Sequence, residues 1–152
     1  MYLDETLILR EIDVDSKAEV LEVMARNLVN KGFVKESYIE AVIEREKNYA
    51  TGLPTKGYSV AIPHTDIEHV NKKAISVGIL KNTVDFGIMG EESATTPVKL
   101  VFMLAMEQAH SQLELLQKLM QIFQDEDTLQ FLANEDSKAK VKNLLNAKLK
   151  TQ

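Results

Sequence analysis

The 152-residue sequence contains no cysteine, no tryptophan and only three histidines. The absence of cysteine excludes disulfide scaffolds, thiolate metal sites and cysteine nucleophiles, and it fits a reducing compartment. A basic excess is also missing, because 18 Lys and Arg oppose 23 Asp and Glu and give a net charge of −5. Most nucleic-acid-binding proteins carry excess positive charge, so we expect no nucleic-acid partner.

Long hydrophobic runs are absent as well. No window approaches the roughly 18 uninterrupted apolar residues that indicate a membrane-spanning helix. The first residues, 1–15, contain neither the basic region nor the apolar stretch of a secretory signal. We therefore expect a cytoplasmic protein without direct membrane insertion, in which residues 1–152 form a single domain.

Glycine and proline are scarce, at 6 and 3 residues, and most of them lie between Gly52 and Pro97. Turns and strands are therefore expected in the middle of the chain, with helices before and after it. Ser16 and Glu19 have the spacing of a helix-initiating capping box, and Gly32 lies where a helix would end. This order predicts an α/β domain whose central sheet is covered on both sides. Apolar periodicity places helices at about 17–31, 36–47, 111–124, 128–133 and 138–148, and strands at about 7–9, 58–62, 74–80 and 98–104.

His64 has the most distinctive setting of the three histidines. It follows an apolar run and a proline in the sequence VAIPHTD, residues 60–66. Pro63 fixes its own φ, so the imidazole is expected to be held stiffly at the end of a strand, where ligand sites of α/β sheets collect. His64 can then act as a nucleophile, a base or a metal ligand, or it can simply cap a turn in which Asp66 is an ordinary turn residue.

The other two histidines have weaker signals. His110 precedes a leucine-rich helix, and a histidine at a helix N-terminus tends to be neutral and can donate a hydrogen bond to an anion. It can equally be a surface residue of a loop. His69 lies among polar residues, and we expect it to be solvated.

Metal and nucleotide chemistry fit the sequence poorly. There is no HxxxH or HExxH pattern, and no glycine-rich phosphate-binding loop of the GxxxxGK[ST] or GxGxxG type. No serine lies in a GxSxG-like elbow, although one sequence does not exclude a Ser-His-Asp triad. We expect neither a metal nor a cofactor.

Taken in order, the motifs resemble the active-site signature of the bacterial sugar phosphotransferase-system enzyme IIA, fructose–mannitol class. They are Arg45-Glu46, Thr51-Gly52-Leu53, the segment 60–66, a strand like 98–104, and the histidine of 110–116, HSQLELL. The resemblance covers roughly residues 3–147. It implies a central mixed, mainly parallel sheet flanked by helices on both faces.

The resemblance also implies a reaction. His64 would accept a phosphoryl group from the phosphohistidine of HPr, on Nε2, and pass it to a cysteine of the IIB component, while the membrane component IIC carries the sugar. Such a transfer needs positioning and charge stabilisation rather than a metal. Arg45 can supply a planar fork of donors and His110 one further donor, although Arg45 can also be a solvated helix-end charge beside Glu44 and Glu46. We therefore expect the strand 98–104 to run beside 60–62, so that the loops bearing His64 and His110 emerge at the same edge of the sheet.

Within the family, the chain most resembles the galactitol-specific branch. The cues are Thr65-Asp66 after the histidine and the segment FGIMG, residues 86–90. The nitrogen-regulatory branch typically has Gly-Arg after its Pro-His, which this sequence lacks. An alternative to transport is a regulatory module of the same fold, which is phosphorylated on His64 and controls another protein by docking.

Overall fold

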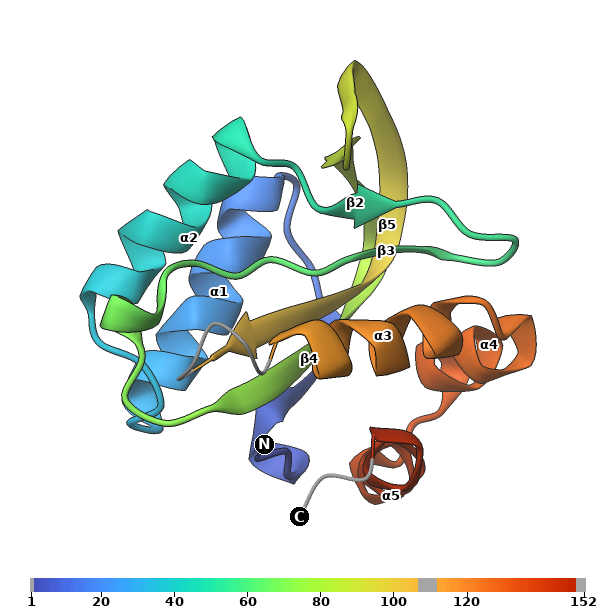
Figure 1. Cartoon of the computed structure of the whole chain (residues 1–152). Coiled ribbons are helices and arrows are strands. Elements are labelled where there is room, and N and C mark those ends of the chain that lie inside the picture. The colour runs from blue at the N-terminus through green and yellow to red at the C-terminus, as the bar shows by residue number, and fades with distance from the viewer. Residues whose placement is uncertain (1, 107–111, 150–152) are drawn as a thin grey trace.

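A computed structural model describes residues 2–106 and 112–149 (Figure 1). The regular elements alternate between helices and strands, with most of the sheet in the middle of the chain. In chain order they are β1 (Ile8–Ile12), α1 (Lys17–Asn30), α2 (Ser37–Asn48), β2 (Gly52–Leu53), β3 (Ser59–Ala61), β4 (Ala74–Ile88), β5 (Glu91–Ala105), α3 (Gln112–Phe123), α4 (Glu126–Asn134) and α5 (Lys138–Leu149), with 3₁₀ turns at Glu5–Leu7 and Ile67–His69.

The five strands of the described chain form one mixed sheet. Its centre is the antiparallel pair β4–β5; β1 runs parallel to β4 on one side, and β3 runs parallel to β5 on the other. The short β2 pairs antiparallel with β3 and also meets β4 at its end, where Gly52 lies opposite Ile88. Three of these five described pairings are parallel, but the longest is antiparallel.

Helices cover both faces of the sheet (Figure 1). A Cβ added to Gly78 of β4 would lie 2.7 Å from the sulfur of Met24, so this face packs closely against α1. The neighbouring position, Val77, lies opposite Phe102 of β5, whose ring is 5.2 Å from that of Phe123 in α3. Successive residues of a strand point to opposite faces, so α1 and α3 lie on opposite sides of the sheet. The predicted α/β fold with a flanked mixed sheet is confirmed.

The helix boundaries follow from local sequence chemistry. Ser16 caps α1 by accepting a hydrogen bond from the Glu19 N–H, as the capping box predicts, and its hydroxyl donates to the Glu19 carboxylate. Gly32, just beyond the helix, has a φ of +83°, which glycine adopts without strain. The described helices lie within a few residues of their predicted bounds.

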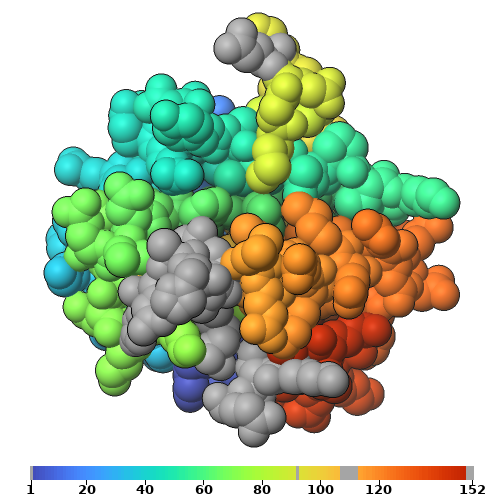
Figure 2. All heavy atoms as spheres, in the orientation of Figure 1, coloured from blue at the N-terminus to red at the C-terminus, as the bar shows by residue number. Residues whose placement is uncertain are grey.

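The β4–β5 hairpin is much longer than the sequence indicated. The strands predicted at 74–80 and 98–104 are each 15 residues long, and they continue to a turn at Met89-Gly90. The exposed polar run Lys81-Asn82-Thr83 follows the predicted strand end, but β4 continues through it, with a shift in its register to β5 between Ile79 and Val84. The tip projects from the molecular surface (Figure 2).

A close backbone approach fixes β2 against this hairpin. The Gly52 carbonyl accepts a hydrogen bond from the Met89 N–H at 2.8 Å. A Cβ on Gly52 would lie only 2.4 Å from the carbonyl oxygen of Gly87, so only glycine allows the two strands to meet here. The segment that enters β2, including Thr51, is thereby held beside the end of β3.

No helix in the described ranges has both the length and the apolar character needed to cross a membrane.

Candidate functional site

His64 lies just beyond the end of β3, on a support fixed by hydrogen bonds. β3 runs parallel to β5, with Ala61 opposite Val101, so the predicted pairing of these two segments is confirmed. Beyond the ladder, the Pro63 carbonyl accepts a hydrogen bond from the Leu104 N–H at 3.0 Å. The chain that carries His64 is therefore tied to the central sheet, and the half-buried imidazole lies at the carboxyl edge of β3, as predicted.

One hydrogen bond determines the protonation pattern of this imidazole. Nδ1 of His64 lies 2.9 Å from the carbonyl oxygen of Ile62. A carbonyl only accepts, so Nδ1 carries the hydrogen, and in the neutral ring Nε2 holds the free lone pair. Burial lowers the pKa of His64, as does the positive charge of Arg45, while the Ile62 carbonyl and Asp66 act in the opposite direction. The net shift favours a neutral ring with a nucleophilic Nε2.

Arg45, in the last turn of α2, brings a cation to this edge. Its Nη1 lies 3.9 Å from Asp66, at the limit of an ion pair, and its guanidinium carbon lies 5.1 Å from the ring centre of Tyr49. Its Nε is buried and has no hydrogen-bond partner among the described residues. Because a buried donor is normally paired, this geometry leaves the guanidinium ready to bind an anion.

Two residues of the site were not predicted: Glu46 and Thr51. The Glu46 side chain is 2% exposed, and its carboxylate accepts hydrogen bonds from the Thr51 N–H at 2.7 Å and from the Thr51 hydroxyl at 2.8 Å. The Thr51 hydroxyl in turn accepts from the Ile62 N–H at 3.2 Å. Both residues belong to the signature motifs, but nothing in their spacing indicated that they are bonded to each other and to the histidine segment.

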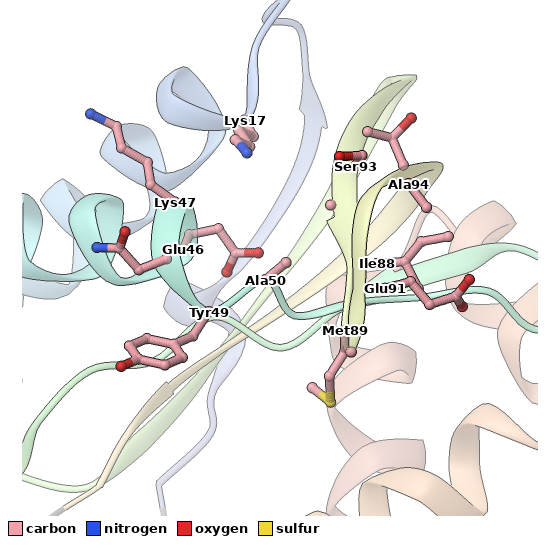
Figure 3. A pocket seen from close by; sticks show the side chains of 14 residues that line it. Lys17, Glu46, Lys47, Tyr49, Ala50, Ile88, Met89, Glu91, Ser93 and Ala94 are labelled. Carbon is pink, nitrogen blue, oxygen red and sulfur yellow. The ribbon is translucent and has the colours of Figure 1, made fainter.

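A cavity of about 810 Å³ lies beside this network, between the end of α2 and the β4–β5 hairpin (Figure 3). Glu46, Tyr49 and Met89 contribute to its walls, whereas His64 and Arg45 do not. His64 is therefore not at the bottom of this cavity. A shallow, half-buried imidazole suits a reaction with another macromolecule better than the enclosure of a small substrate.

The remaining predicted residues have different outcomes. His110 lies outside the described residues. His69 is half-buried rather than fully solvated, and its Nδ1 lies 2.8 Å from the Ser37 hydroxyl. Within the described ranges, no group of three or more His, Cys, Asp or Glu side chains is arranged to hold a metal ion.

Large apolar side chains are exposed near the site. Tyr49 is 65% exposed and Met89 is 39% exposed, and both line the cavity beside the network. Of the other apolar residues adjacent to the motifs, Leu53 and Ile88 are half-buried, and Ile62 is part of the core. Of the exposed pair, Tyr49 also adjoins the cation of the site, because its ring centre lies 5.1 Å from the guanidinium carbon of Arg45.

Known proteins resemble this chain along most of its length. A family model described as "Phosphoenolpyruvate-dependent sugar phosphotransferase system, EIIA 2" matches residues 1–148. The chain is 30% identical over 116 residues to the galactitol-specific EIIA component of Escherichia coli K12. This match covers 76% of the chain and 77% of the relative. It is also 48% identical over 64 residues to a mannitol-specific EIICBA component of Buchnera aphidicola, but this match spans 42% of the chain and only 9% of the longer protein.

A solved structure extends the agreement to three dimensions. The Escherichia coli complex of enzyme IIAMTL and phosphorylated enzyme IIBMTL contains a chain that matches with a TM-score of 0.75 and 26% identity, covering 99% of each chain. The fold, the family match and the relatives agree along nearly the whole chain. The chain therefore belongs to the EIIA type 2 family and is a phosphocarrier component of the phosphoenolpyruvate-dependent sugar phosphotransferase system.

Proposed function

We propose that this protein accepts a phosphoryl group from phospho-HPr on Nε2 of His64 and passes it to a cysteine of a IIB partner. IIB then phosphorylates the sugar while IIC carries it across the membrane. The observation that carries this proposal is the hydrogen bond from Nδ1 of His64 to the Ile62 carbonyl, because it leaves Nε2 as the available nucleophile.

The chemistry of the step follows from this geometry. The Nε2 lone pair forms a bond to phosphorus as the P–N bond of phospho-HPr breaks, and the donor imidazole leaves with the electron pair. The His64 ring then carries both Nδ1–H and the phosphoryl group and gains positive charge, which the Ile62 carbonyl stabilises. In the second transfer a IIB thiolate attacks phosphorus, and His64 leaves as a neutral imidazole that still bears its Nδ1 hydrogen.

Arg45 is proposed to stabilise the transferring group. Its partner in the free protein is a contact at 3.9 Å to an exposed Asp66, and such exposed pairs contribute little. Exchanging this contact for the phosphoryl oxygens would give its unpaired Nε–H an acceptor. His110 is proposed as a further donor, since β3 and β5 are parallel and His110 follows the end of β5 in the sequence.

Galactitol is the proposed sugar. Support comes from the galactitol-specific relative, which matches the chain over about three quarters of its length. The sugar itself would be bound by IIB and IIC, so the prediction concerns which IIB protein the chain serves.

The test is a reconstituted transfer from phosphoenolpyruvate through enzyme I, HPr and this protein to purified IIB proteins. We expect phosphate to reach a galactitol-type IIB faster than a mannitol-type IIB. A faster transfer to mannitol-type IIB would overturn the assignment of the sugar. Phosphorylation of this protein without transfer to any IIB would instead support the regulatory alternative.

A further inference from the structure

A buried carboxylate that does not contact the proposed reacting atom lies within the candidate site. Glu46 is near the carboxyl end of α2, where the helix dipole disfavours negative charge, and burial raises its pKa. Within the described part of the chain, both its oxygens accept hydrogen bonds from Thr51 alone. Placing a carboxylate at the unfavourable end of a helix, away from water, is costly, so packing by itself does not account for this residue.

The direction of each hydrogen bond in this network is fixed by chemistry. The Ile62 N–H can only donate, so the Thr51 hydroxyl accepts from it at 3.2 Å. The hydroxyl hydrogen is then free to donate to Glu46 at 2.8 Å, and the carboxylate, an acceptor when ionised, completes the chain. If the hydroxyl hydrogen of Thr51 instead pointed toward Ile62, neither it nor the Ile62 N–H would have an acceptor.

The network reaches His64 through a single residue. Ile62 donates its N–H to Thr51, and its carbonyl accepts from Nδ1 of His64 at 2.9 Å. The following carbonyl, that of Pro63, is bound by the Leu104 N–H at 3.0 Å, and proline restricts its own φ. The orientation of the Ile62 carbonyl therefore depends on anchors on both sides, of which Thr51 is the one before it.

We propose that Glu46 is a positioning residue which, through the Thr51 hydroxyl, orients the Ile62 carbonyl and so keeps His64 in the tautomer that exposes the Nε2 lone pair. This inference rests on the proposed phosphoryl transfer for its role in the reaction. The tautomer itself is a property of the free protein and is measured without any transfer.

Substitutions at Thr51 separate positioning from packing. Thr51→Val keeps the volume but removes the hydroxyl that both accepts and donates, whereas Thr51→Ser keeps the hydroxyl and loses a methyl group. Thr96→Val is the matched control, because it also removes a buried hydroxyl, one bonded to Ser59 and outside the network. If Thr51→Val does not fold, Glu46→Gln serves instead, since an amide can accept from only one of the two Thr51 donors.

The first measurement is the tautomer of His64, read from the ¹⁵N shifts of histidine-labelled protein at a pH where the ring is neutral. We expect Nδ1–H in the wild type, Thr51→Ser and Thr96→Val, and a mixture with Nε2–H in Thr51→Val. If the reactive tautomer falls to about one fifth, the single-turnover rate from phospho-HPr should fall about fivefold. Thr51→Ser should retain most of the rate.

Two results overturn the inference. One is a wild-type tautomer in a folded Thr51→Val or Glu46→Gln protein; the other is an equal shift of the tautomer in Thr96→Val. Failure of the proposed function is a different outcome. In that case Thr51→Val still shifts the tautomer, but wild-type His64 takes no phosphate from phospho-HPr.

Discussion

Replacement of Arg45 by lysine separates the charge of this residue from its geometry. Lysine keeps the positive charge but lacks Nε and the planar fork of donors. In the free protein the Arg45 Nε is buried without a described partner, and Nη1 is only 3.9 Å from Asp66. The guanidinium donors of Arg45 therefore lack good acceptors in the free protein.

The contacts of Arg45 determine how much the transfer rate and the free energy of unfolding should change. A hydrogen bond to a charged group contributes about 1.5–3 kcal/mol, so losing one in the transition state should slow transfer by about 10- to 150-fold. Leaving a buried donor unpaired costs about 1–3 kcal/mol, so removing this donor by Arg45→Lys should raise the free energy of unfolding. Lysine also makes a weaker cation–π contact with Tyr49, which should lower the free energy of unfolding by about 0.5–1 kcal/mol. The free energy of unfolding should consequently stay equal or rise.

Single-turnover transfer from phospho-HPr and urea unfolding measure the two quantities separately. Arg26→Lys is the control, because Arg26 pairs with Glu36 at 2.8 Å on the exposed surface and should not affect transfer. We expect Arg45→Lys to transfer phosphate more slowly than the wild type, while its free energy of unfolding stays equal or rises. A wild-type rate, or a loss of stability that accounts for the slower transfer, would refute the role assigned to Arg45.

Four other predictions follow from the same geometry. His110→Ala should remain folded and transfer phosphate more slowly; an unchanged single-turnover rate would show that this histidine is only a loop residue. Because the pKa of His64 is lowered, its phosphorylation rate should persist below pH 6.5 and decline only when the ring gains a proton. Asp66→Asn removes a charge that raises this pKa, so the midpoint of the His64 titration, measured by NMR, should move to a still lower pH. Gly52→Ala should lower the free energy of unfolding by about 1–3 kcal/mol and slow transfer, because its Cβ would lie 2.4 Å from the Gly87 carbonyl oxygen; unchanged urea unfolding would contradict this. Saturating IIB should block phosphorylation by HPr, since one nucleophile serves both partners through a small interface of under about 1,200 Å², and simultaneous binding of both would contradict a shared face.

The sequence predicted the parts of the fold that depend on local chemistry. The cap at Ser16, the glycine after α1 and the apolar faces of the helices are short-range signals, and the structure matches them. The pairing of β3 with β5 was also predicted, because two apolar runs that precede histidines fit parallel neighbours. The length of the β4–β5 hairpin was missed, since the polar run Lys81-Asn82-Thr83 interrupts the apolar pattern of β4 before buried residues resume at Val84 and Phe86.

The features of the candidate site also fall into those that the sequence indicated and those that it did not. His64 was identified from its neighbours in the sequence, and Arg45 from the resemblance to the enzyme IIA signature. The hydrogen bonds that Thr51 donates to Glu46 and accepts from Ile62 could not be predicted, because they join the end of a helix, a loop and the end of a strand. Such contacts depend on how the elements pack, and in this protein on the approach of β2 to the hairpin at Gly52.

The most direct test of the central claim is to locate the phosphate after incubation with phosphoenolpyruvate, enzyme I and HPr. Peptide mapping and ³¹P–¹⁵N NMR identify both the residue and the ring nitrogen. The account predicts one acid-labile phosphate per chain, on Nε2 of His64, and none in His64→Ala. Phosphate on another residue, on Nδ1 of His64, or at a normal rate in His64→Ala would contradict it.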